Sequence, residues 1–242
     1  MTTARGEGGP VPPPRKPLAI PLALGTLLVA LFVALGVWQV ERRAWKLDLI
    51  AQVDRHLAAA PVAAPGLATR IVAADAYRRV SVRGRFRHDR ETLVQALTER
   101  GAGWWVVTPL VADRGFTVLV NRGFVPQDRA AAASRPREPV AVTGLLRLTE
   151  PGGRFLRAND PGANRWYSRD VAAIARMRRL GGVAPYFIDA DATPNPGGLP
   201  IGGLTVIAFR NTHLLYALTW FGLAALTAGA MVQLVRMRGA AL

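Results

Sequence analysis

The chain has 242 residues and no cysteine, so disulfide bonds, thiolate metal sites and cysteine nucleophiles are excluded. It carries 31 Lys and Arg against 16 Asp and Glu, which gives a formal net charge of +15. The length allows one or two domains.

The N-terminal part predicts a tail followed by a membrane anchor. Residues 1–17 are dense in Pro and Gly, which is typical of a flexible segment that buries no core. The run that follows has no charge as far as Val40, which is long enough to cross a bilayer and predicts a transmembrane helix over 18–40. No small-residue cleavage site follows it, so we expect an uncleaved anchor. Apolar residues continue at helical spacing and predict that the helix extends beyond the membrane to Pro61.

Residues 41–210 predict one folded domain outside the membrane. From Arg79 to Arg87 apolar and mostly basic residues alternate, which is typical of a half-buried strand whose basic face is solvated. One helix is expected over Asp170–Leu180, with Asp170 near its N-cap and a stop at Gly181 and Gly182. Further strands are expected at Glu91–Leu97, Trp104–Val111, Phe116–Asn121, Val140–Leu148, Tyr186–Asp189 and Leu204–Arg210. Many short strands with few helices indicate an α+β domain with a mainly antiparallel, barrel-like sheet.

A second uncharged run predicts another transmembrane helix over 211–235, followed by a tail over 236–242. The predicted fold is therefore a membrane protein in which two terminal helices flank the extramembrane domain. Arg236 and Arg238 follow the second helix, so the positive-inside rule favours cytoplasmic termini and an extracytoplasmic domain in a cell membrane of the bacterial plasma membrane type. For a tethered basic domain, anionic membrane lipids are a nearer partner than nucleic acid, which we do not expect. The alternative explanation of the positive charge is that the excess of arginine binds no partner.

Residues suited to catalysis are sparse. The histidines, His56, His88 and His213, have no metal-site spacing, and the two outside the second apolar run are interpreted as surface residues. The chain has neither a Gly-rich phosphate loop nor a GxSxG nucleophile motif. Asp189 and Asp191 are neighbours in sequence, but paired-carboxylate catalysis is a poor explanation for them. We therefore expect a protein that is not an enzyme.

Polar and aromatic residues gather where both predicted membrane helices meet the domain. They are Trp38, Gln39, Arg42, Asn211, His213, Tyr216 and Trp220. One interpretation is an interfacial belt of aromatic residues and snorkelling arginines. The other is a site for a planar ligand with anionic arms, because imidazole binds iron, aromatic rings stack and arginine pairs with carboxylates. Haem is such a ligand.

Seven sequence strings in order resemble the surfeit locus protein 1 family of cytochrome c oxidase assembly factors. The strings are LGVWQVERRAWKLDLI, YRRVSVRGRF, GWWVVTPL with VLVNRGFVP, NDPGANRWYSRD, PYFIDA and RNTHLLYALTWFGLA. The resemblance covers about residues 35–225. It implies a non-enzymatic factor that promotes maturation of the haem a centres in the membrane that carries oxidase subunit I.

The resemblance also implies roles for individual residues. Bacterial members have been linked to haem a, with a histidine at the start of the second helix, which is His213 here. The Trp-Gln-x-x-Arg signature of the family corresponds to Trp38, Gln39 and Arg42, and the other matched positions are Asn211, Tyr216 and Trp220.

From this resemblance we expect His213 as an axial ligand or contact of the haem iron. Arg42, with Arg43 or Arg210, would pair with the propionates, and Trp38, Tyr216 and Trp220 would pack on the ring. Haem A synthase would supply the haem and oxidase subunit I would receive it. The alternative is a haem-free membrane scaffold that stabilises an assembly intermediate of subunit I.

Overall fold

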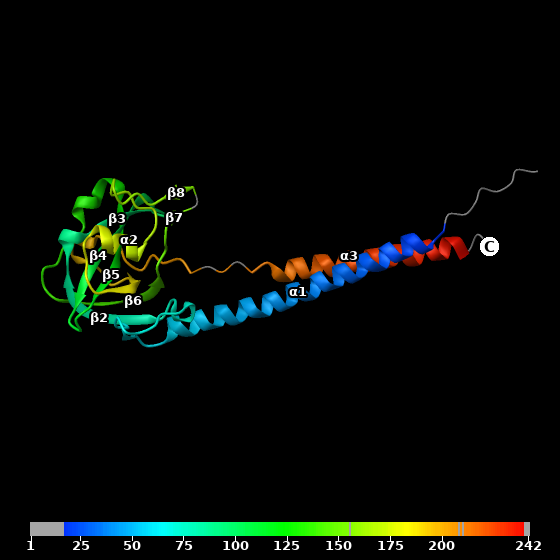
Figure 1. The fold of residues 1–242 in the computed structure, drawn as a ribbon, viewed down its shortest axis with the longest axis horizontal. Coiled ribbons are helices and arrows are strands. Elements are labelled where there is room, and N and C mark those ends of the chain that lie inside the picture. The colour runs from blue at the N-terminus through cyan, green and yellow to red at the C-terminus, as the bar shows by residue number, and fades with distance from the viewer. Residues whose placement is uncertain (1–16, 155, 208, 210, 240–242) are drawn as a thin grey trace, which may run out of the picture. The chain divides into compact units, whose positions relative to one another are not determined.

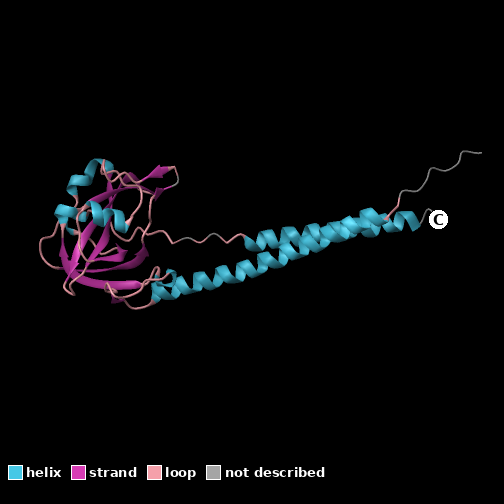
Figure 2. Cartoon of the chain, viewed as in Figure 1, coloured by secondary structure: helices cyan, strands magenta, loops and turns pink. Residues whose placement is uncertain are grey.

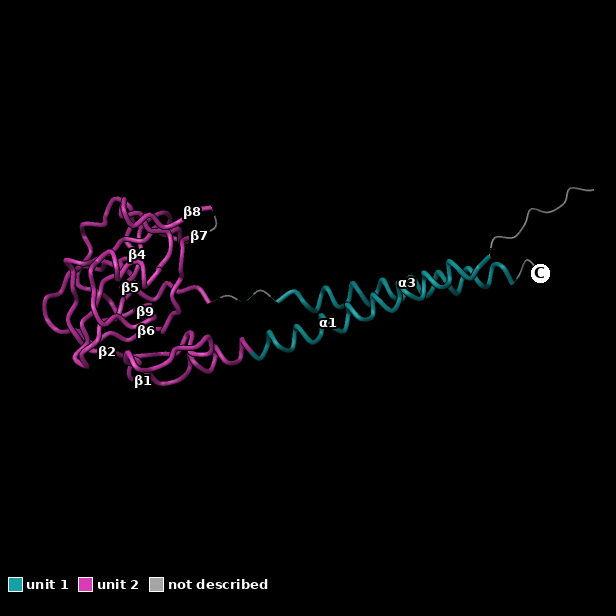
Figure 3. The backbone as a smooth tube through the Cα atoms, in the orientation of Figure 1, with its two compact units in different colours: residues 1–48, 209–242 teal, residues 49–208 magenta. Residues whose placement is uncertain are grey.

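The computed structural model describes residues 17–154, 156–207, 209 and 211–239, and they divide into two compact units (Figure 3). The first unit covers residues 1–48 and 209–242, and the second covers residues 49–208. Ala208 and Arg210 of the expected last strand lie outside the described residues, and so does the propionate contact expected of Arg210. The N-terminal tail through Lys16 and the last three residues are also outside them.

Helices α1 (Ala19–Ala58) and α3 (His213–Gly239) are the two membrane-spanning helices, coloured blue to cyan and orange to red in Figure 1. α1 is longer than its apolar part, as the helical spacing predicts, because no residue interrupts the helix until Pro61. Most side chains of both apolar stretches are exposed in the protein alone, which suits helices surrounded by lipid.

The two membrane helices pack against each other in antiparallel order, and small residues allow the close approach (Figure 2). A Cβ atom placed on Gly36 would lie 2.5 Å from Cε1 of Phe221, and one on Gly25 would lie 2.5 Å from Sδ of Met231. On α3 the two buried residues of this interface are both alanine, Ala217 and Ala224. These positions follow the three- and four-residue spacing of one helix face.

The second unit contains a closed barrel. Its strands are β1 (Val62–Ala63), β2 (Arg79–Phe86), β3 (Thr92–Thr98), β4 (Gly101–Ala112), β5 (Thr117–Pro126), β6 (Val140–Leu148) and β9 (Val183–Ala190). The strand order is β1-β2-β6-β9-β5-β4-β3, and a further pairing of β2 with β4 closes β2, β6, β9, β5 and β4 into a five-stranded barrel. The pairings are antiparallel except β1 with β2 and β5 with β9. A small hairpin of β7 (Gly153–Arg154) and β8 (Arg157–Ala158) lies outside the barrel sheet.

The expected membrane-anchored α+β fold with a mainly antiparallel barrel is therefore confirmed. The strand predicted over Val140–Leu148 is β6, while β5 and β9 extend beyond their predicted ends. The strand predicted over Leu204–Arg210 was wrong for the described residues 204–207 and 209, which form no strand. The reason is closure, because every barrel strand already pairs on both sides and offers no free edge.

Helix α2 (Val171–Met177) begins as predicted, since the Asp170 carboxylate accepts a hydrogen bond from the Ala173 backbone N–H at 3.0 Å. It ends earlier than the predicted Leu180. Arg179 takes a positive φ of 51°, which breaks the helical conformation before Gly181 and Gly182 are reached.

Three apolar clusters hold the barrel. The smallest joins Val106 of β4 and Val125 of β5 to Ala133 and Leu199, and the other two are larger. One fills its interior from alternating residues of β2, β5, β6 and β9, including Val80, Val120 and Ile188. The other packs α2 and the buried Trp166 against the outer faces of β3, β4 and β5. Large side chains thus cover both faces of β5, which explains why nine of its ten residues are buried.

Asp189 is buried at 3 % exposure beside the second cluster and accepts four side-chain hydrogen bonds. The donors are Asn121, Arg147, Arg169 and Thr205, at 2.7, 2.7, 3.1 and 3.0 Å. Asp191 stands apart and caps the backbone N–H of Thr193 at 3.0 Å. Asp189 is therefore a structural carboxylate saturated by its partners.

Candidate functional site at the paired ends of the membrane helices

His213 and Gln39 are the two predicted site residues that contact each other. His213 is the first residue of α3, and its Nδ1 lies 2.8 Å from Oε1 of Gln39 on α1. An amide oxygen only accepts hydrogen bonds, so Nδ1 carries the proton and donates it. Nε2 is then the nitrogen with the lone pair, and no described residue hydrogen-bonds to it.

Aromatic packing lies farther along the same helix pair. The rings of Trp220 on α3 and Phe32 on α1 stack with centroids 5.8 Å apart and planes 23° apart. Ala217, buried at 2 % exposure, lies between His213 and Trp220 on the same helix face. Trp220 is therefore a contact between the two helices in this structure.

Other predicted site residues point elsewhere. Trp38 and Tyr216 are 54 % and 52 % exposed, so they lie on the outer surface of the helix pair. The guanidinium carbon of Arg42 lies 4.0 Å from the centroid of the Trp45 ring, one turn along α1. Such a cation–π contact holds Arg42 along the helix surface. The structure thus brings Gln39 and His213 together and leaves Trp38, Tyr216 and Arg42 on the outside.

Asn211 lies two residues before α3 and its side-chain oxygen is unusual. Oδ1 is buried and has no hydrogen-bond partner among the described residues. A buried carbonyl oxygen without a donor costs about 1–3 kcal/mol, and the described residues supply no donor to this oxygen. Arg210, the other residue expected to pair with propionates, lies outside the described residues, and Arg43 is half-buried on α1.

These features fit a haem-type ligand in part. An imidazole whose Nδ1–H is held by an acceptor has its Nε2 lone pair fixed in direction, which is how metal-binding histidines are commonly oriented. The orphaned Asn211 oxygen is a second polar atom ready for a ligand group. Among the described residues, no group of three or more His, Asp or Glu side chains could hold a metal ion. The chemistry available here is therefore single-histidine ligation.

Sequence reasoning missed Gly25, Phe32 and Gly36, which pair the helices together with the predicted Gln39. Gly25, Phe32, Gly36 and Gln39 form one face of α1, as their contacts with α3 show. Their spacing of seven, four and three residues is the signal that could have found them.

The remaining histidines lie in the second unit and correct an expectation. His56 Nδ1 lies 3.0 Å from the carbonyl oxygen of Ala76. His88 is not a surface residue, because its side chain is only 15 % exposed and its Nε2 lies 3.0 Å from the carbonyl oxygen of Pro136. Burial lowers the pKa of His88 below its usual value.

Comparisons with known proteins agree with the resemblance seen in the sequence. The profile of the SURF1 family matches residues 26–225. Surfeit locus protein 1 of Mus musculus is 38 % identical over 221 residues, which is 83 % of this chain and 71 % of that protein. The protein of the same name from Homo sapiens is 39 % identical over 216 residues, covering 80 % and 70 %. A SURF1-like protein of Monosiga brevicollis is 39 % identical over 223 residues, covering 85 % and 84 %. The family match runs from within α1 through the barrel and into α3, and the chain belongs to the SURF1 family.

Proposed function

We propose that this protein is an assembly factor for haem–copper cytochrome c oxidase that holds haem a for delivery into subunit I. The single observation that carries the haem part is the His213–Gln39 contact, which leaves Nε2 of His213 free to bind iron. Family membership supports the assembly role, because the family that the sequence resembles acts in oxidase assembly. In this account the protein binds and transfers and catalyses no reaction.

His213 would hold the iron and Gln39 would fix the orientation of the imidazole. Asn211 Oδ1 would accept a hydrogen bond from the bound ligand, which would satisfy its orphaned carbonyl. Arg42 would reach a propionate only by leaving the face of Trp45, so we assign it a role at the outer edge of the proposed haem site. Trp38 and Tyr216 are exposed and would contact either the haem edge or the receiving membrane protein.

A single protein ligand suits a carrier. Two axial histidines would bind the iron more tightly and slow its release, and a carrier must release the haem that it binds. We place both termini in the cytoplasm and the barrel outside, in a membrane of the bacterial plasma membrane type. Haem A synthase would then be the donor, oxidase subunit I the recipient, and membrane lipids the surroundings of α1 and α3.

Complementation tests this function in a strain that lacks its own family member. We expect the wild-type chain to restore oxidase activity and the haem a content of subunit I, and His213→Ala to restore little of either. Thr212→Ala, which changes the exposed neighbour, is the matched control. Full restoration by His213→Ala, with normal haem a in the oxidase, would favour the haem-free scaffold instead.

A further inference from the structure

The barrel has a cavity at one mouth that the haem proposal does not use. It measures about 230 Å³ and is lined by side chains of β2, β5 and β6 and by the loop after β9. Apolar residues form most of its wall, among them Val120, Val140 and Val142, which continue the apolar interior of the barrel. Mouths of barrels of this kind are common places for small-molecule sites.

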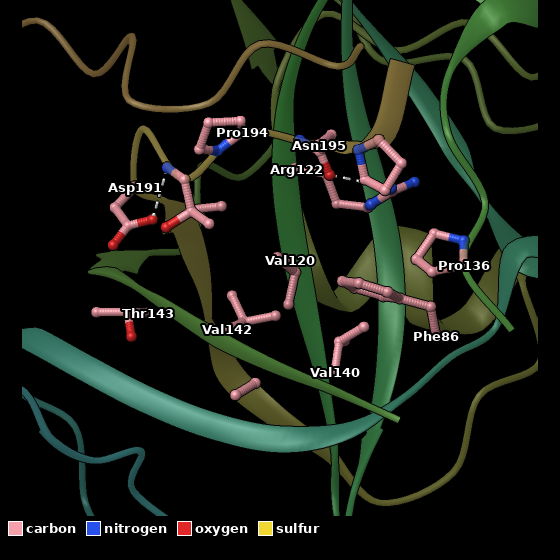
Figure 4. Close-up of a pocket in the computed structure, with 14 residues that line it drawn as sticks. Phe86, Val120, Arg122, Pro136, Val140, Val142, Thr143, Asp191, Pro194 and Asn195 are labelled. Carbon is pink, nitrogen blue, oxygen red and sulfur yellow. Dashed lines mark hydrogen bonds between the residues drawn. The ribbon is translucent and has the colours of Figure 1, made fainter. Parts of the chain in front are cut away.

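A buried arginine stands in this apolar cavity. Arg122 is 2 % exposed and lies on β5 two residues after Val120, so the strand alternation carries both residues to the same cavity. Figure 4 shows Arg122 and Asn195 at one end of the cavity and Asp191 and Thr143 at the other. Burial lowers the pKa of Arg122 to about 10, which leaves its guanidinium charged at neutral pH.

Local backbone structure is arranged around this arginine. The register of β4 against β5 shifts here, so that Val106 of β4 faces both Arg122 and Gly123. Gly123 has a φ of +131°, and a Cβ atom there would lie 2.2 Å from the carbonyl oxygen of Ile201. Bulges of this type redirect a side chain and are frequent beside functional sites.

The guanidinium lacks the partners that a buried charge requires. Nε and Nη1 are buried without a hydrogen-bond partner among the described residues. Nη2 has one long contact, 3.4 Å to Oδ1 of Asn195. Nη1 lies 3.9 Å from Oε2 of Glu91, beyond hydrogen-bond length, and the same carboxylate is held by Arg135 at 3.0 Å. One carboxylate therefore faces two guanidiniums.

One edge of the guanidinium, with Nε unpaired and Nη2 weakly paired, has the geometry of a carboxylate site. Nε and Nη2 share one edge of the guanidinium plane, the edge on which carboxylates form two parallel hydrogen bonds. The Phe86 ring lies 4.9 Å from the guanidinium carbon and forms an apolar wall beside it. A ligand carboxylate would replace the weak Asn195 contact, and an apolar chain would lie along Val140 and Val142.

We propose that the mouth of the barrel binds a small monocarboxylate with a short apolar chain, anchored by Arg122. The inference rests on the cavity, the buried arginine and its weakly satisfied hydrogen-bonding edge, and it is independent of haem binding. The 230 Å³ volume favours a compact ligand over a long-chain lipid.

The test uses the full-length protein in nonionic detergent, with hexanoate as the probe and hexanamide as its neutral match. Saturation-transfer NMR of the probe gives the affinity. The place of binding is followed in protein labelled with ¹⁵N-arginine. The Nε–Hε resonance of Arg122 is assigned there as the one that disappears in Arg122→Lys. We expect saturable binding of hexanoate with a shift of that resonance, and binding of hexanamide at least tenfold weaker.

Variants separate the site from general effects. Arg122→Gln should weaken hexanoate binding at least tenfold, and Arg100→Gln, an exposed arginine outside this cavity, should leave it unchanged. Val140→Phe fills the part of the cavity assigned to the apolar chain and keeps Arg122, so it should also abolish binding, and it decides the matter if Arg122→Gln does not fold. Absence of saturable binding, equal binding of hexanamide, or binding that survives Val140→Phe would overturn the proposal.

Discussion

Gln39 and His213 are 174 residues apart in the sequence, and their side chains lie 2.8 Å apart between Oε1 and Nδ1. The contact joins the two membrane helices and fixes which imidazole nitrogen is free. It therefore gives Gln39 a positioning role in the proposed site, because the amide touches Nδ1 of the histidine and leaves Nε2 untouched.

Replacing Gln39 tests that positioning role. Gln39→Leu removes the acceptor for Nδ1–H, and loss of such a supporting hydrogen bond typically lowers metal affinity about 10–100-fold. Gln39→Glu keeps an acceptor and should retain most of the affinity. Titration of the detergent-solubilised variants with haem, followed by visible absorption, measures both. Equal affinities for wild type and Gln39→Leu would show that the amide does not position the histidine.

The helix pair should be sensitive at Gly36. A methyl group there would meet the Phe221 ring at 2.5 Å, so Gly36→Ala should destabilise the pair by about 1–3 kcal/mol, as overpacking does. Removing the ring in the double variant Gly36→Ala/Phe221→Ala should recover part of that loss. Thermal unfolding in detergent measures each variant. Gly222→Ala is the control, since nothing lies within 4 Å of a Cβ atom there. A loss equal to that of the control would contradict the described packing.

The barrel should depend on Asp189 far more than on Asp191. Asp189→Ala leaves the guanidiniums of Arg147 and Arg169 without this buried carboxylate, and breaking a buried ion pair costs about 3–5 kcal/mol. Asp191→Ala loses one bond to a backbone N–H and should cost about 1 kcal/mol. Urea unfolding followed by tryptophan fluorescence gives the two values. Similar losses for both variants would show that the Asp189 network adds little.

His88 should make the stability of the barrel depend on pH. Burial is the main cause that lowers its pKa, and the nearby Arg122 charge acts in the same direction. The folded protein thus favours neutral His88, so its contribution is present above the unfolded pKa of about 6.5 and is lost as pH falls below it. His88→Gln should flatten the decrease in unfolding midpoint between pH 7 and pH 5. An identical decrease in wild type and variant would exclude His88 as the cause.

Much of this fold could be predicted because its signals are local. The apolar runs specify α1 and α3, and the alternation of apolar and polar residues specifies β2 and β6. The strand expected at Leu204–Arg210 failed because local alternation contains no information on whether a neighbouring sheet edge is free. Barrel closure through the β2–β4 pairing is a long-range property.

The candidate site divides in the same way. Position along the helices was sufficient to select Gln39 and His213, but it could not show that Trp38 and Tyr216 are exposed. The rotation of each helix about its axis is set by packing partners such as Phe32 and Gly36. Arg122 was not selected at all, because an arginine among the many in this chain gains significance only when its burial is known.

The most direct measurement is the visible absorption spectrum of the protein purified in detergent after co-expression with the enzymes of haem a synthesis. Wild type, His213→Ala and Thr212→Ala are compared. The account predicts a haem a spectrum in wild type and Thr212→Ala and its loss in His213→Ala. No haem in wild type, or equal haem in wild type and His213→Ala, would contradict ligation by His213 and leave the scaffold as the function to pursue.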